Sequence, residues 1–256
     1  MAAAGGHEIT WGALIPGLNW IEEKFAIVVE EGGHQVLQPA HHVSNAILIV
    51  LIILCLVVIA RGKIKQDASS DEDLVPDGKL TVRNLLELMV QGILGIMHDS
   101  MGPVAPRFLF LIGALAFFIL FSNLSGLVPG FVPPTDNLNT TAACALVVFF
   151  ATHYYGFKEH GVAYLKHFVG PFWWLAWLMV PIEIISHLAR PMSLSLRLFG
   201  NIMGDHKVGA IFFMLAPLAV PVFTMVLGLF VSFVQTFVFM LLSMVYISGA
   251  IEHAEH

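Results

Sequence analysis

The segment 181–207, PIEIISHLARPMSLSLRLFGNIMGDHK, places an arginine inside an otherwise apolar helical stretch. On an ideal helix that advances about 100° per residue, Glu183, Ser186 and Asn201 fall within about 40° of Arg197. His187 and Asp205 fall at the edge of this face, at about 80°. The guanidinium stays protonated at any physiological pH, so Arg197 can act as a fixed positive charge but not as a proton carrier.

An ionised arginine inside a bilayer costs about 3 kcal/mol on insertion scales, so it needs a wet cavity or a counter-charge. The structural alternative is a buried arginine satisfied by backbone carbonyls or a local carboxylate. No acid stands three or four residues from Arg197, which favours a partner on another helix or another chain. Arg190 is a weaker candidate, because it precedes Pro191 and its long side chain can reach the cytoplasmic interface.

The last apolar stretch carries a matching small and polar stripe. Thr224, Gly228 and Tyr246 fall within about 20° of Gln235 on an ideal helix. A face of this kind favours packing against another polar helix face. We expect Gln235 to face Arg197 across an antiparallel helix pair, and the alternative is ordinary interhelical hydrogen bonding.

The composition requires that these helices lie in a membrane. Of the 256 residues, 57% are hydrophobic and 12% are charged, and the mean hydropathy is +0.82. A soluble domain carries about a quarter charged residues. The apolar runs are also long enough to cross a hydrocarbon layer of about 30 Å. The net charge of −6 without a basic cluster argues against a nucleic-acid partner.

We therefore predict an all-α polytopic membrane protein with a single membrane domain over residues 1–256. Its parts are an external N-terminal segment (1–43), one N-terminal transmembrane helix (45–60), an interfacial amphipathic helix (81–100), a transmembrane hairpin (108–155) and two long tilted helices that form a membrane-embedded hairpin (172–251). Each arm of the last hairpin, about 172–216 and 220–251, exceeds the ~20 residues of an upright crossing, which implies tilt.

The orientation follows from charge. Arg61, Lys63 and Lys65 follow the first span, and basic residues mark the cytoplasmic side of a membrane. The N-terminus is therefore expected outside and the C-terminus in the cytoplasm, and the chain's start does not resemble a cleaved signal peptide. For residues 81–100, a helix packed on other protein is the alternative to an interfacial helix. Cys55 and Cys144 lie in apolar runs without metal-ligand spacing, so we expect packing roles and no metal site.

Three motifs carry a resemblance to a known family. Ser195-Leu-Arg197-Leu-Phe-Gly-Asn201 closely resembles the signature of subunit a of F-type ATP synthases. The stretch 234–248, VQTFVFMLLSMVYIS, is similar to the family's final helix, and 123–129, NLSGLVP, is similar to the end of its third helix. The resemblance covers most of the chain from about residue 40 onward, in the same order.

This resemblance implies a function that the polar face alone does not supply. Subunit a of the family lies in a bacterial inner membrane, beside a ring of c subunits that carry membrane-embedded carboxylates and near the b subunits of the peripheral stalk. Two offset aqueous half-channels lead ions, most often protons, to and from those carboxylates. The chain itself would have no catalytic site and no cofactor, and it contains no glycine-rich phosphate loop that would bind a nucleotide directly.

Carried over by position, the resemblance assigns seven residues to ion translocation. Arg197 attracts the ring carboxylate and blocks leakage, Glu183 and Ser186 line the cytoplasmic half-channel, and the external one is lined or bordered by Asn201, His206 and Gln235, with Asp205 as a further candidate.

This sequence raises two questions about the external half-channel that the family resemblance implies. Gly228 stands where some relatives have an ionisable residue, so a relay must use His206 with another group such as Asp205. His206 also falls about 180° from Arg197 on an ideal helix. Either Gly204 loosens the helix, or the channel approaches from behind.

Two other classes of protein compete with this interpretation. A stand-alone secondary transporter or channel subunit would carry its substrate within one chain, but such proteins often contain repeated halves, and no repeat is recognisable here. A structural subunit of a respiratory complex would explain the apolar composition, but it would give Arg197 no functional role.

Overall fold

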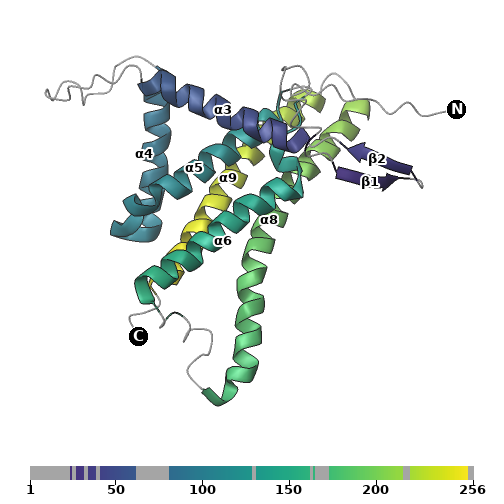
Figure 1. Cartoon of the computed structure of the whole chain (residues 1–256). Coiled ribbons are helices and arrows are strands. Elements are labelled where there is room, and N and C mark those ends of the chain that lie inside the picture. Colours follow the sequence, from purple (N-terminus) through teal and green to yellow (C-terminus); the bar gives the residue numbers. More distant parts are fainter. Residues whose placement is uncertain are drawn as a thin grey trace, which may run out of the picture.

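A computed structural model of the chain is a bundle of long helices, with a short β-ribbon before the first of them (Figure 1). The structure describes residues 24, 27–31, 34–38, 41–61, 81–128, 131–161, 164, 173–215 and 220–252. Most of the predicted external segment 1–43, the predicted loop 61–80 beyond Arg61, Pro217 and the polar tail after Glu252 lie outside the described residues.

Six long helices lie within the described residues. They are α3 (His41–Arg61), α4 (Val82–Met101), α5 (Ala105–Ser125), α6 (Leu138–His160), α8 (Ala176–Leu215) and α9 (Val220–Glu252), with short 3₁₀ turns η2 (Gly102–Val104), η3 (Pro134–Asp136) and η4 (Trp173–Leu175). The predicted all-α polytopic fold class is confirmed. Among the described residues the structure adds an antiparallel ribbon of β1 (Ile27–Glu31) and β2 (His34–Gln38), and β1 is rich in the β-branched residues that favour extended backbone.

Four stretches of the described residues are long and apolar enough to cross a membrane, namely His41–Arg61, Val82–Ser125, Leu138–His160 and Val222–Ile251. No such stretch is found in the described part of α8, along which charged residues recur. With 40 residues, α8 is about 60 Å long, twice the thickness of the hydrocarbon layer. A helix of this length fits a bilayer only when it is strongly tilted or bent. The chain is an integral membrane protein.

Two apolar clusters among the described residues join the helices from α4 to α9. One joins the end of α4 to α5 and α9 and is centred on Met97, Phe108 and Met244. The other joins α5, α6, α8 and α9 and includes Leu198 and the buried Cys144. The end of α4 therefore packs on protein, whereas the large apolar residues Leu85 and Leu88 near its start are exposed.

Polar contacts define the two ends of the bundle. Asn45 Nδ2 donates a 2.7 Å hydrogen bond to the carbonyl oxygen of Val132, which ties the start of α3 to the connection between α5 and α6. At the opposite end, a ring nitrogen of His160 lies 2.7 Å from the carbonyl oxygen of Ile251, which joins the ends of α6 and α9. We refer to these as the Val132 end and the Ile251 end.

Candidate functional site

Arg197 lies near the middle of α8 and is exposed on the surface of the chain. The exposed residues around it on α8 are mostly apolar or small: Met192 is 61% and Leu196 50% exposed, Ser193 and Gly200 are exposed as well, and Asn201 is the polar one. Within the described ranges, no carboxylate forms an ion pair with its guanidinium. The chain therefore presents a permanent cation on an apolar surface.

Asn201 lies one helical turn beyond Arg197 and contacts the neighbouring helix. Its Nδ2 donates a 2.5 Å hydrogen bond to Oε1 of Gln235 on α9. Gln235 is only 3% exposed, and its Nε2 has no hydrogen-bond partner in the described part of the chain. The amide that we expected to face Arg197 thus bonds to Asn201, and it keeps a donor available for water or for a partner.

α8 and α9 run antiparallel. Eleven residues before Asn201, the guanidinium of Arg190 lies 5.6 Å from the centre of the Tyr246 ring, which is eleven residues after Gln235. The two contacts therefore share one register, in which the start of α8 lies beside the end of α9. Arg190 stacks on an aromatic face, a contact that stabilises a guanidinium.

The second half of α8 brings a titratable pair toward the Val132 end. Asp205 lies so close to α9 that a Cβ added at Gly228 would be 2.7 Å from its Oδ2. His206 faces a different helix, since a Cβ added at Gly126, just beyond the end of α5, would be 2.6 Å from its Nε2. Both glycines therefore provide the room that these side chains occupy.

α8 is helical without interruption through Gly204. Asp205 and His206 consequently point to different neighbours, Asp205 to α9 and His206 to the end of α5 and to η3. His206 Nδ1 lies 3.8 Å from Oδ2 of Asp136. The helix is therefore not loosened at Gly204, and His206 points away from the side of α8 that carries Arg197.

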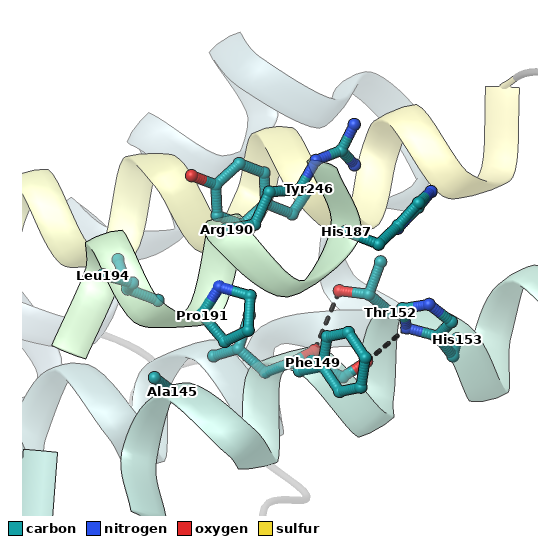
Figure 2. A pocket seen from close by; sticks show the side chains of 10 residues that line it. Ala145, Phe149, Thr152, His153, His187, Arg190, Pro191, Leu194 and Tyr246 are labelled. Carbon is teal, nitrogen blue, oxygen red and sulfur yellow. Dashed lines mark hydrogen bonds between the residues drawn. The ribbon is translucent and has the colours of Figure 1, made fainter. Parts of the chain in front are cut away.

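The first half of α8 carries a second titratable group, closer to the Ile251 end. Glu183 and Ser186 are half-buried, and Glu183 Oε1 lies 3.2 Å from Nε2 of the buried His187. His187 lines a pocket between α6, α8 and α9 (Figure 2). On its far side is His153, whose ring centre lies 5.1 Å from that of His187.

Sequence reasoning missed two of these residues. His153 and Asp136 both lie within the predicted transmembrane hairpin 108–155, and neither was singled out. An ionisable residue inside an apolar span is a signal in itself, because hydrocarbon excludes it unless it has a partner. That signal would have identified His153. No periodicity predicts the contact of Asp136 with His206, because it joins η3 to α8.

The polar groups are spaced along α8 on either side of Arg197. Glu183 precedes it by 14 residues, or about 21 Å, and Asp205 follows it by 8 residues, or about 12 Å. A fixed cation thus separates two sets of groups that can bind and release protons. Among the described residues, no three His, Cys, Asp or Glu side chains gather in a way that would hold a metal ion.

Comparison with known proteins shows which family the chain resembles. The model of a family described as ATP synthase A chain matches residues 43–248. An ATP synthase subunit a of Trichlorobacter lovleyi is 50% identical over 218 residues, which cover 85% of this chain and 94% of that protein. One of Geobacter sulfurreducens is 52% identical over 204 residues, covering 80% and 86% of the two chains.

A third relative, ATP synthase subunit a 1 of Syntrophotalea carbinolica, is 50% identical over 213 residues, covering 83% of this chain and 86% of its own. The matched region includes α3 through α9 almost entirely, and with it every residue of the polar face on α8. The chain therefore belongs to the ATP synthase A chain family, the subunit a family.

Proposed function

We propose that this chain translocates protons in the membrane sector of a rotary ATP synthase, at an interface with a ring of c subunits. Glu183 and Ser186 line a half-channel from the cytoplasm, and Asn201, Asp205, His206 and Gln235 line or border one from the outside. A proton enters one half-channel, neutralises a ring carboxylate, travels with the ring for nearly a full turn and leaves through the other. The chain is a non-catalytic subunit in this scheme.

The observation that carries this proposal is Arg197, an exposed cation on an apolar surface without an ion-pair partner among the described residues. A charge in such a position is unfavourable in lipid and calls for an acid from a neighbouring chain. At a separation of 4 Å and an effective dielectric constant near 20, the attraction between opposite unit charges is about 4 kcal/mol. That is strong enough to position a ring carboxylate and weak enough for the next proton to release it.

The same cation prevents leakage. The two titratable groups flank Arg197 along one helix, so a proton that moved directly between them would pass a permanent positive charge in a medium of low dielectric constant. It follows that protons cross only by way of the ring. A membrane potential of 100 mV supplies about 2.3 kcal/mol per transferred charge to drive the rotation.

The orientation in this proposal puts the Val132 end outside and the Ile251 end in the cytoplasm. It rests on the basic residues after the first span, of which Arg61 ends α3, and on Lys158 near the end of α6. The membrane is a bacterial inner membrane, in agreement with the bacterial relatives. The b subunits of the peripheral stalk are the other proposed partners.

A stand-alone transporter is the second candidate, and the position of Arg197 argues against it. A transporter of that kind would enclose its charged groups within the chain, whereas this guanidinium faces outward. The polar groups of α8 precede and follow Arg197 along the helix, and the exposed surface around Arg197 needs a partner chain.

The test is Arg197→Ala in the complete ATP synthase, assayed as ATP-driven proton pumping into inverted membrane vesicles. Pumping should fall to background while the amount of the subunit in the membrane stays normal. Arg83→Gln, which removes a partly exposed arginine paired with Glu87 on α4, is the matched control and should pump at the wild-type rate. Coupled pumping in Arg197→Ala at a rate similar to that of the control would refute the proposal.

A further inference from the structure

One side of α8 is polar toward both ends of the helix and apolar at its centre. Glu183, Leu194, Leu198 and Asp205 follow one another at intervals of 11, 4 and 7 residues. On a helix that advances about 100° per residue, these intervals place the four side chains within about 60° of one another. Leu194 is 1% exposed and Leu198 is 0% exposed. Two buried leucines therefore interrupt the side of α8 along which the carboxylates of the two proposed half-channels lie.

The two leucines belong to the apolar cluster that joins α5, α6, α8 and α9, which we call the apolar layer. Each of its members is at most 7% exposed. Apart from the thiol of Cys144, their side chains contain only carbon and hydrogen, so the layer gives water and protons almost nothing to bind. The layer includes Ile119 on α5, Ala145 and Val148 on α6, Leu194 and Leu198 on α8, and Phe239 on α9.

The apolar layer lies at the depth of Arg197. The contacts of Arg190 with Tyr246 and of Asn201 with Gln235 set the register of α8 against α9, and in that register Phe239 is level with Arg197. Leu198 directly follows Arg197 in the chain, about 100° around the helix. Arg197 is exposed, whereas Leu198 is fully buried. A fixed cation and an apolar layer thus stand at one depth on different sides of α8.

The apolar layer has a polar region on each side of it. Toward the Ile251 end lies the pocket between α6, α8 and α9, in which Ala145 and Leu194 form the end opposite the two imidazoles (Figure 2). Toward the Val132 end, Asp205 stands three residues beyond Ile202 of the layer, which is about one helical turn. A direct route between the two polar regions through the interior of the chain crosses the layer.

Three buried hydroxyl groups within about one helical turn of layer residues are engaged by their own helices. Thr141, Ser195 and Ser243 each donate to a carbonyl oxygen three or four residues earlier, at 2.8–3.1 Å. A hydroxyl has a single proton to donate, so these groups have none left for a water molecule. Apolar cavities stay dry, and apolar constrictions in channels exclude water. The layer is therefore built to keep water out.

We infer that the apolar layer is the barrier that stops protons from passing between the half-channels inside the chain, an inference that rests on the function proposed above. Arg197 acts on the exposed side of α8, where its charge repels a passing proton. Leu198 and its neighbours act on the buried side, where a hydrated proton would lose its water in apolar surroundings. The two barriers are separate, so a polar group in the layer opens a leak although Arg197 is still present.

The experiment separates a leak through this chain from transfer by the ring. Complete ATP synthase, with c subunits whose membrane carboxylate is replaced by an amide, is incorporated into liposomes. A potassium diffusion potential drives protons inward, and a pH-sensitive dye inside the vesicles records their uptake. Because the amide takes up no proton, the ring carries no flux. Complexes with the wild-type chain should therefore show only the flux of liposomes without protein.

Leu198→Asn places an amide that binds water inside the apolar layer. The proton flux should rise at least about tenfold above that of the wild-type chain, which corresponds to about 1.4 kcal/mol off the barrier. Ile112→Asn is the matched control, because Ile112 is 1% exposed and belongs to the other apolar cluster. It buries the same amide outside the layer and should not leak.

If Leu198→Asn is absent from the membrane, Ile119→Asn decides the matter, since Ile119 is 0% exposed and shares α5 with the control position. Wild-type flux in a layer variant that is present at the normal amount would overturn the inference. Equal leaks from the layer variant and from Ile112→Asn would also overturn it, because any buried amide would then suffice. Proton flux through the wild-type chain beside the amide ring would instead refute the proposed function, so the two failures are distinguishable.

Discussion

Asn201 lies one helical turn beyond Arg197 on α8, and its Nδ2 donates a 2.5 Å hydrogen bond to Oε1 of Gln235 on α9. This bond fixes the register of the two helices next to the exposed cation. Because Gln235 accepts through Oε1, its Nε2 has no hydrogen-bond partner within the described part of the chain. The pair therefore sets the polarity of the surface against which a ring carboxylate would move.

Removing either amide should weaken transport without stopping it. A hydrogen bond between membrane helices contributes about 0.6 kcal/mol on average, which corresponds to about threefold in rate. We expect Gln235→Ala and Asn201→Ala each to lower the initial rate of ATP-driven pumping by about this factor. The double variant should be no slower than either single one, because both changes remove the same bond. Multiplicative losses in the double variant would show that the two amides act independently.

A side chain at Gly228 should impair proton transport, because of the carboxylate beside it. A Cβ at this position would lie 2.7 Å from Asp205 Oδ2 and 3.0 Å from a methyl carbon of Leu127. Asp205 ends in a movable carboxylate, so Gly228→Ala should displace the group and leave the chain folded. Since a displacement of about 1 Å at a reacting group costs up to ~100-fold, we expect pumping to fall roughly tenfold.

The control for this change lies on the same helix. A Cβ at Gly249 has no neighbour within 4 Å, so Gly249→Ala should pump normally. Equal rates in the two alanine variants, at equal subunit content, would exclude Asp205 from the external path.

Asn45 should matter for stability rather than for transport. It is 1% exposed and donates to the carbonyl oxygen of Val132. Asn45→Leu keeps the branched shape of the side chain and leaves that carbonyl without its donor, which costs about 1–3 kcal/mol. In a domain of this size, each kcal/mol lowers the unfolding midpoint by about 2–4 °C. The midpoint of the purified complex measures the effect, and Val58→Leu, at a site on α3 that is 68% exposed, should leave it unchanged.

The helices could be predicted from the sequence because membrane insertion depends on apolar length and on charge, both of which are local. The arms predicted at about 172–216 and 220–251 correspond to α8 at Ala176–Leu215 and α9 at Val220–Glu252. Helical periodicity also placed Asn201 and Glu183 on the side of α8 that carries Arg197. The β-ribbon was not predicted, because ten residues of mixed polarity carry little periodic signal.

The contacts between helices could not be predicted in the same way. Periodicity gives the direction of a side chain around its own helix, but not the helix that it meets. His206 illustrates this limit, since its direction of about 180° from Arg197 is correct for a continuous helix. The finding that Gly126 and Asp136 occupy that side comes from the packing of α5 and η3 against α8. The pairing of His153 with His187 likewise depends on how α6 crosses α8.

The most direct test asks what covers the face of Arg197. In a chain whose exposed Cys55 is replaced by serine, a cysteine introduced at Ser193 or Gly200, both exposed beside Arg197, is labelled with a short photo-activated cross-linker in native membranes. A cysteine at Val58, exposed on α3, serves as the control. We predict cross-links to a c subunit from positions 193 and 200 and none from position 58. Cross-links to lipid alone at 193 and 200, in membranes that contain the assembled complex, would contradict the account.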